Sequence, residues 1–204
     1  MIDNRKTKIS NFSAAILAGG KNSRFNGENK SFLKLDNQFV IEKIIEVLKQ
    51  IFSEIIIVTN DKTAYSMFSE CKIATDYYRE IGPLGGIHAA LQNAKHENVF
   101  IVSCDMPFLN KNLILKQISS HITEKSNITI PVLHNFKEPL HGIYCKNVLT
   151  SIENFIQTTD KYKIIGFFDL VKVNYFEVNQ NKIKAFTNIN NPEDYKILIQ
   201  KLKK

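Results

Sequence analysis

The sequence has few of the residues that build disulfide frameworks, zinc sites or membrane spans. Its 204 residues include only three cysteines, widely spaced and without a Cys-x-x-Cys pair, which argues against both a disulfide framework and a zinc site. No apolar run approaches the roughly 18 residues that a membrane span needs. Residues 1–12 are polar and basic and lack the apolar centre of a signal peptide. We therefore expect reduced thiols and a soluble, cytoplasmic protein.

Several common binding signatures are also missing. The chain contains neither the Gly-x-Gly-x-x-Gly fingerprint of dinucleotide-binding proteins nor a Walker-type loop. Its net charge is +7, but the lysines are spread along the chain and much of the excess lies near the two ends. Because no aromatic residues interleave with a basic cluster, we expect anionic ligands rather than nucleic acid.

Glycine is scarce and unevenly distributed. Six of the eight glycines lie in two short segments, Leu17–Lys30 and Gly82–Gly86. Glycine lets backbone N–H groups approach an anion, and Arg24 and Lys30 add positive charge to the first segment. The first segment is therefore typical of a loop that binds a triphosphate, and two glycine-rich loops suggest one ligand held from two sides.

Short apolar runs alternate with helical patterns along the chain, which is typical of an α/β fold with a mostly parallel sheet covered by helices on both faces. We expect residues 1–12 to form an N-terminal tail and residues 13–204 to form a single domain. The apolar spacing predicts strands over residues 14–17, 55–59, 72–75, 99–104 and 128–132. It predicts helices over residues 40–52, 84–94, 111–121, 148–157 and 192–202.

Two aspartates follow predicted strands, at the sheet edge where α/β proteins bind ligands. Asp76 follows a short strand and precedes the second glycine segment, and Asp105 directly follows the strongly apolar run Val99–Cys104. A carboxylate in that position is well placed to hold Mg²⁺ against a phosphate. In isolation, Asp105 could equally be a helix cap or a turn residue.

Four motifs in order carry a resemblance to a known family. They are Leu17–Lys30, beginning Leu-Ala-Gly-Gly, then Gly82–Gly86, Cys104–Phe108 and Asn188–Asp194. In this order the sequence resembles the molybdenum cofactor guanylyltransferases, the MobA family, over nearly the whole chain. Related nucleotidyltransferases typically read Leu-Ala-Ala-Gly, so Gly20 favours guanine as the base.

The resemblance implies a Rossmann-like nucleotidyltransferase fold with a mixed sheet, and transfer of GMP from GTP to the terminal phosphate of molybdopterin. It implies Mg²⁺ as the cofactor, GTP and molybdopterin as substrates, and transient contacts with proteins that deliver the cofactor or mature molybdoenzymes. We expect a monomer or weak oligomer. By position, Arg24, Lys30 and Asp105 would be catalytic, and Asp105 would bind the metal. The ligand-binding set would be Leu17, Ala18, Gly19, Gly20, Lys30, Asp76, Gly82, Gly86, Asp105, Asn188 and Asn190.

The first loop departs from the family pattern at two positions. Asn26 stands where the family usually has the glycine of Met-Gly, and Asn29 stands where it usually has the aspartate before the lysine. Two alternatives to guanylyl transfer remain. One is an enzyme with another nucleotide or acceptor, such as cytidylyl transfer to molybdopterin or to a sugar or isoprenoid phosphate. The other is a non-catalytic protein that binds GTP or carries the cofactor.

Overall fold

A strongly apolar segment, residues 12–17, forms an interior strand of a mixed sheet. In the computed structural model, which describes residues 8–19, 29–78 and 80–202, β1 (Phe12–Leu17) is buried along its whole length. It pairs in parallel with β4 (Ile55–Val58) on one side and with β6 (Asn98–Ser103) on the other. β5 (Lys72–Ala74) continues the parallel arrangement beyond β4.

Beyond β6, one strand runs in the opposite direction, and the two strands after it return to the direction of β6. β9 (His141–Cys145) is antiparallel to both β6 and β7 (Ile128–Leu133). β10 (Val173–Glu177) runs parallel to β7 at the far edge, and the short β8 (Phe136–Lys137) folds back on β7. The mostly parallel mixed sheet predicted from the sequence is confirmed. Both the first and the last residue of each predicted strand lie within two residues of those of the observed strand.

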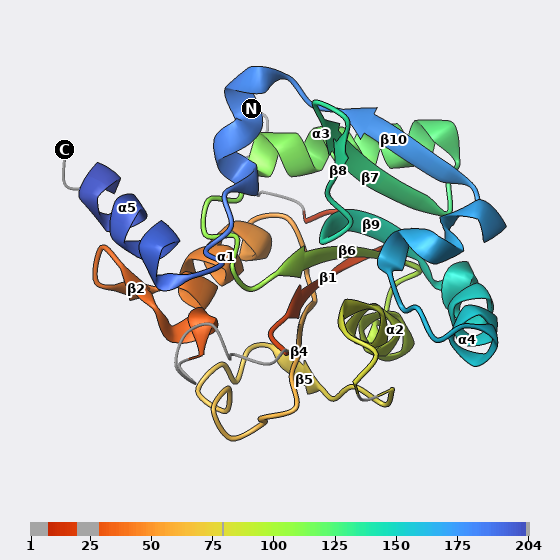
Figure 1. The fold of residues 1–204 in the computed structure, drawn as a ribbon, viewed down its shortest axis with the longest axis horizontal. Helices are drawn as coiled ribbons and strands as arrows, with labels where there is room; N and C mark the ends of the chain where they lie inside the picture. Colours follow the sequence, from red (N-terminus) through yellow and green to blue (C-terminus); the bar gives the residue numbers. More distant parts are fainter. Residues whose placement is uncertain (1–7, 20–28, 79, 203–204) are drawn as a thin grey trace, which may run out of the picture.

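Helices cover both faces of this sheet, as predicted (Figure 1). On one face the core contains residues of α1 (Val40–Lys49), α3 (Lys111–Glu124) and α5 (Pro192–Leu202). On the other it contains residues of α2 (Pro83–Asn93) and α4 (Leu149–Thr158). Successive side chains of β1 point to opposite faces of the sheet. Ala14 and Ile16 therefore belong to the first core, and Ala15 and Leu17 belong to the second.

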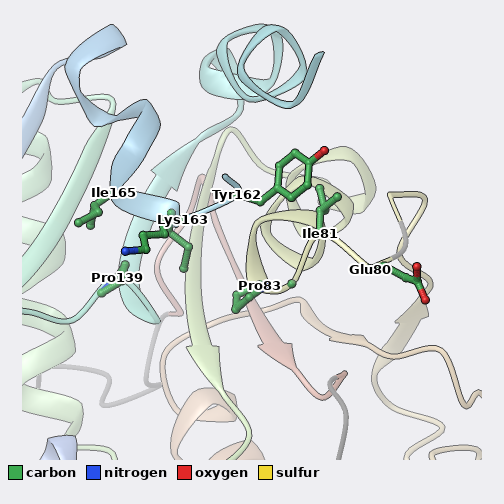
Figure 2. A pocket seen from close by; sticks show the side chains of 9 residues that line it. Glu80, Ile81, Pro83, Pro139, Tyr162, Lys163 and Ile165 are labelled. Carbon is green, nitrogen blue, oxygen red and sulfur yellow. The ribbon is translucent and has the colours of Figure 1, made fainter. Parts of the chain in front are cut away.

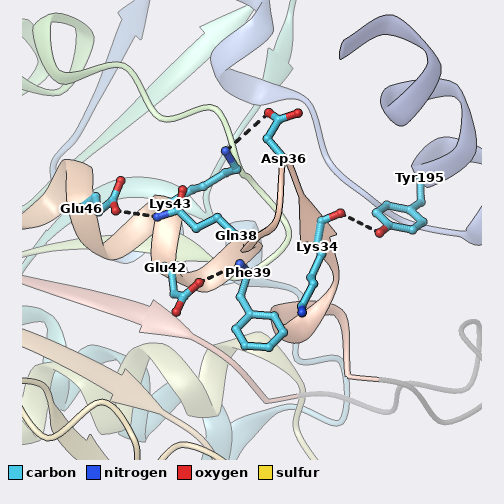
Figure 3. A network of polar contacts seen from close by, with 8 residues as sticks. All are labelled: Lys34, Asp36, Gln38, Phe39, Glu42, Lys43, Glu46 and Tyr195. Atoms are coloured by element: carbon cyan, nitrogen blue, oxygen red, sulfur yellow. Dashed lines mark hydrogen bonds and ion pairs between the residues drawn. The ribbon is translucent and has the colours of Figure 1, made fainter. Parts of the chain in front are cut away.

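A small hairpin, formed by β2 (Lys34–Leu35) and β3 (Gln38–Phe39), leads into α1 and contacts α5 (Figure 3). The Glu42 carboxylate accepts the Phe39 N–H at 2.8 Å and so caps the start of α1. The Tyr195 hydroxyl of α5 donates to the Lys34 carbonyl at 2.7 Å. α1 ends three residues earlier than predicted, because the N–H groups of Gln50 and Ile51 bond to the carbonyls three residues back, those of Val47 and Leu48, instead of four.

Four short 3-10 helices complete the described chain: η2 (Lys30–Phe32), η3 (Lys146–Val148), η4 (Ile164–Leu170) and η5 (Gln180–Phe186). All three cysteines are free, as expected. In the described ranges, no helix combines the length and apolarity that crossing a membrane requires.

Two histidines are buried beside the sheet. His121 hydrogen-bonds to Thr129 and Asn98, whereas His141 packs between the rings of Phe100 and Phe186. Burial lowers the pKa of each imidazole to about 4. Both histidines are therefore neutral in the folded protein at pH 7.

We predict that acid destabilises the fold through these histidines. Because their folded-state pKa is depressed, their stabilising contribution is complete above pH ~6.5 and is lost as the pH falls toward about 4, by up to about 3 kcal/mol each. His141→Leu should flatten the pH dependence of the unfolding free energy in this range, as measured by urea denaturation. An equal slope in His141→Leu and the parent would contradict the prediction.

Candidate active site

The ends of four parallel strands bring the sequence motifs together. The register pairs Leu17 of β1 with Val58 of β4 and with Ser103 of β6, so the residues that follow these strands emerge at one edge of the sheet. Ala18 and Gly19 follow β1, Asp76 follows β5, and Asp105 follows β6. This is the edge at which open α/β sheets bind ligands.

Lys30 and Asp105 form the charged centre of this edge. The Lys30 ammonium lies 3.6 Å from Asp105 Oδ2, and about a fifth or less of each side chain is exposed. Lys30 is the first residue of η2, which Asn29 caps by accepting the Ser31 N–H at 3.0 Å. A cation and a carboxylate this close can bind a phosphate group together with a metal ion.

The second glycine segment packs against Asp76. Gly82, which precedes α2, has a φ of 71°, a conformation that residues with a Cβ rarely adopt. A Cβ on Gly85 would lie 2.6 Å from both Asp76 carboxylate oxygens and from the Tyr78 carbonyl. A Cβ on Gly86 would lie 3.2 Å from Leu17 Cδ1, so this glycine lets α2 approach β1 closely.

The late asparagine motif also reaches this site. The Ile189 N–H donates to the Asp105 carbonyl at 3.0 Å, which holds the neighbouring Asn188 beside the aspartate. Asn188 Oδ1 is buried and has no hydrogen-bond partner among the described residues. Asn190 is exposed, while the Asn191 side chain accepts the Asp194 N–H at 2.9 Å and caps α5, as its position before Pro192 suggests.

Glu138 is a second acidic group near Asp105 that the sequence motifs did not identify. Its pKa is raised first by burial and then by the negative charge of Asp105. The Glu138 carbonyl accepts the His141 N–H at 3.1 Å, and the Leu140 carbonyl accepts the Ser103 N–H at 3.1 Å. These bonds attach the turn before β9 to the end of β6. The only signal in the sequence was its place in the segment Glu138–Tyr144, which lies outside the four motifs.

A hollow of about 540 Å³ opens beside the second glycine segment (Figure 2). Its walls come from the start of α2, the turn before β9 and the link between α4 and η4. The Tyr162 ring lies on the Ile81 side, and the Lys163 side chain extends toward Pro139. The lining residues are Glu80, Ile81, Gly82, Pro83, Pro139, Tyr162, Lys163, Ile164 and Ile165.

The structure thus brings Ala18, Gly19, Lys30, Asp76 and Asp105 to one edge of the sheet, together with Gly82 and Asn188. Leu17 and Gly86 lie behind this surface, in the packing between β1 and α2. Gly20, Arg24 and Asn26 are outside the described residues.

We predict that Gly85→Ala disturbs Asp76. The added methyl meets two carboxylate oxygens and a backbone carbonyl, so we expect a loss of about 1–3 kcal/mol in unfolding free energy and weaker nucleotide binding. Gly86→Ala is the matched control, because its methyl meets only the end of the Leu17 side chain. Urea denaturation and nucleotide titration measure the two effects. Equal losses in both variants would contradict the assignment.

Solved structures share this arrangement. Molybdopterin-guanine dinucleotide biosynthesis protein A from Archaeoglobus fulgidus superposes with a TM-score of 0.80 at 24% identity, covering 94% of this chain and 98% of its own. A putative protein from Aquifex aeolicus superposes with a TM-score of 0.74 at 30% identity, covering 89% of this chain and 94% of its own. The fold is therefore that of the MobA-like nucleotidyltransferases.

Sequence comparisons identify the family. The profile of the MobA-like NTP transferase domain matches residues 14–173. A probable molybdenum cofactor guanylyltransferase from Clostridium perfringens (strain 13 / Type A) is 39% identical over 93% of this chain and 96% of its own length. One from Carboxydothermus hydrogenoformans is 34% identical over 94% and 97%. The chain therefore belongs to the MobA-like NTP transferase family and is a nucleotidyltransferase.

Proposed function

We propose that this protein transfers GMP from GTP to the terminal phosphate of molybdopterin, releasing pyrophosphate and forming the guanine dinucleotide form of the molybdenum cofactor. The observation that carries the proposal is the 3.6 Å pair of Lys30 and Asp105, at the sheet edge where the Leu-Ala-Gly-Gly segment begins. The names of the C. perfringens and C. hydrogenoformans relatives support guanine as the base and molybdopterin as the acceptor.

In this proposal the nucleotide lies along the ends of β1 and β5. Ala18 and Gly19 face the base and ribose, Asp76 contacts the nucleotide, and Gly82 forms part of the opposite wall. Gly19 suits this role because, among the residues that the structure describes, none has an atom within 4 Å of the position that the Gly19 Cβ would occupy. Lys30 holds the triphosphate. Gly20 and Arg24 are assigned to the same ligand from the sequence alone.

The residues present fit a magnesium ion. Mg²⁺ prefers oxygen ligands and usually binds through one or two protein side chains together with substrate phosphates. Asp105 offers a carboxylate, and Asn188 offers a buried amide oxygen without a partner among the described residues, one residue before Ile189, whose N–H bonds to the Asp105 carbonyl. When bound, the ion would neutralise negative charge on the phosphates. Because of its place in the Asn188–Asp194 motif, Asn190 is assigned to binding a phosphate or the pterin.

The chemistry needs positioning and charge neutralisation more than a protein nucleophile. An oxygen of the acceptor phosphate attacks the α-phosphorus of GTP, and the bond to the β-phosphate oxygen breaks. Two anions must approach each other, so the Lys30 ammonium offsets their repulsion and the charge that builds on pyrophosphate. A phosphate monoester is already largely ionised near pH 7, so no general base is required.

The acceptor is best accommodated in the hollow of Figure 2. This hollow lies between Gly82 and Pro139, the latter in the turn that is bonded to the end of β6 through Leu140. Molybdopterin combines an aromatic ring system with a phosphate, and Tyr162 and Lys163 offer a ring and a cation for these two groups. The attacking and leaving oxygens must lie roughly in line, which fits an acceptor on the α2 side and pyrophosphate on the Lys30 side.

Other properties are proposed without support from the geometry. These are a cytoplasmic location, a monomeric or weakly oligomeric state, no nucleic-acid partner, a domain that begins at residue 13, and transient contacts with proteins that deliver or receive the cofactor.

We predict that the product of the reaction contains GMP. The protein is incubated with each NTP in turn, with Mg²⁺ and molybdopterin, and the nucleotide-linked product is identified by mass. A product that carries CMP, or one formed on another acceptor, would contradict the proposal. A protein that binds GTP but releases no pyrophosphate would be the non-catalytic alternative.

Asp105→Asn and Lys30→Ala should each lower the turnover number by roughly 100-fold, the usual loss when one electrostatic contact to a transition state is removed. The Asp105→Asn defect should be the more sensitive of the two to Mg²⁺ concentration. Steady-state assays of pyrophosphate release provide the measurement. Asp160→Asn, which changes an exposed aspartate that does not line the hollow, is the control. Normal Mg²⁺-dependent turnover in Asp105→Asn would refute its assignment.

Lys163→Gln should raise the KM for molybdopterin by about tenfold while changing the KM for GTP little, because it removes a charge-assisted bond to the acceptor phosphate. Lys161→Gln, two residues earlier and outside the hollow, is the matched control. If both variants bind molybdopterin like the parent, the acceptor lies elsewhere.

A further inference from the structure

Tyr65 is a fully buried tyrosine that none of the family motifs contains. It lies in the segment between β4 and β5, and none of its surface is exposed. Its ring packs against Phe32 of η2, with centroids 5.1 Å apart, and against Phe68 at 6.4 Å. This packing accounts for the burial of the ring. A buried hydroxyl costs free energy unless it is hydrogen-bonded, so the Tyr65 hydroxyl must have partners inside the protein.

Those partners are the two residues on either side of Lys30. Asn29 Nδ2 donates to the Tyr65 hydroxyl at 2.9 Å, and the hydroxyl donates to Ser31 Oγ at 2.8 Å. The Ser31 N–H donates to Asn29 Oδ1 at 3.0 Å. These three bonds close a ring around the Lys30 backbone. The phenol also lies 3.4 Å from the Ala18 carbonyl, at the end of β1.

The network also lies beside the strand ends from which Asp105 emerges. The Ala18 carbonyl that the phenol approaches follows Leu17, and the Leu17 carbonyl accepts the N–H of Cys104, the residue before Asp105, at 3.1 Å. Burial raises the pKa of Tyr65 to about 12, so the phenol keeps its proton at neutral pH and can donate it.

We propose that Tyr65 is a positioning residue: through Asn29 and Ser31, its hydroxyl fixes the Lys30 backbone and thereby the Lys30 ammonium relative to the Asp105 carboxylate. The proposal rests on the function proposed above, in which these two groups serve the reacting phosphates. Tyr65 itself touches no substrate. Lysine has a flexible four-carbon side chain, so the backbone at its base must be held if the 3.6 Å spacing is to persist.

Asn29 gives this network a donor that the usual family residue lacks. An aspartate, the residue usual at this position in the family, would only accept hydrogen bonds when ionised, and the phenol would have to donate to it. The Asn29 side chain offers the phenol both a donor, Nδ2 at 2.9 Å, and an acceptor, Oδ1 at 3.2 Å. When Nδ2 donates, the phenolic proton is available for Ser31.

The test is a double-mutant cycle between Tyr65→Phe and Lys30→Ala, measured on turnover. Tyr65→Phe keeps the ring and removes only the hydroxyl, and we expect kcat to fall about tenfold, as small displacements of reacting groups commonly cause, with a much smaller change in the KM for GTP. In the Lys30→Ala background the same change should have no further effect, because there is no ammonium left to position. An additive cycle, or an unchanged kcat in Tyr65→Phe, would overturn the proposal.

A loss of stability must be separated from a loss of positioning. Ser126→Ala is the matched control, because Ser126 is a buried hydroxyl bonded to His121 and Thr129, away from the site. It should lower the melting temperature without lowering kcat. If Ser126→Ala lowers kcat as much as Tyr65→Phe at a similar melting temperature, Tyr65 has only a structural role.

The cycle also stays informative if the proposed function is wrong. Should the nucleotide panel select another NTP or acceptor, the cycle is run with those substrates. Should no NTP react, the cycle is measured on the dissociation constant of GTP in the presence of Mg²⁺, which needs no turnover. Tyr65→Phe should then raise this dissociation constant only when Lys30 is present. An additive result on either quantity counts against Tyr65 alone, whereas the identity of the product tests the function alone.

Discussion

The parallel pairing of β1 with β4 and β6 is the constraint on which the site depends. Because all three strands end at the same edge, residues far apart in sequence emerge together: the Leu-Ala-Gly-Gly segment from one strand and the Cys-Asp-Met-Pro segment from another. The two apolar cores that cover the sheet hold this register, since a slip of one residue would turn each buried side chain toward the opposite layer. The core thus determines which strand ends, and therefore which of these segments, meet at this edge.

The charged groups at this edge depend on supports that carry no charge. Gly85 leaves room for the Asp76 carboxylate, the backbone of Ile189 holds Asp105, and the ring of bonds around Lys30 runs through a phenol, an amide and a hydroxyl. Neutral supports can be buried with their hydrogen bonds satisfied, whereas further charges would compete with the phosphates for Lys30. The site therefore concentrates its charge in a few side chains and its rigidity in their neighbours.

The sequence predicted the fold class, the parallel strands and both helical layers, because buried parallel strands and amphipathic helices have strong hydrophobic patterns. It predicted Lys30 and Asp105 because their motifs follow such strands directly. It did not predict β9 and β10: β9 contains a glycine and a histidine, and β10 is a half-exposed edge strand. Tyr65 and Glu138 were missed because they reach the site through tertiary contacts that no local spacing records. For Gly20, Arg24 and Asn26, the sequence remains the source of their assignment.

The reversal of β9 has a consequence for how such a site can change over evolution. The segments that leave the strands parallel to β1 reach the binding edge, and three of the four motifs lie in or next to such segments. Because β9 runs in the opposite direction, the segment that enters it reaches the same edge; this segment comes from β7 and includes the short strand β8, in which Phe136 is largely exposed. Insertions or deletions in that hairpin can reshape the acceptor side while leaving the registry of β1, β4 and β6 intact. In this way the same sheet can keep its nucleotide-binding edge while the acceptor molecule changes.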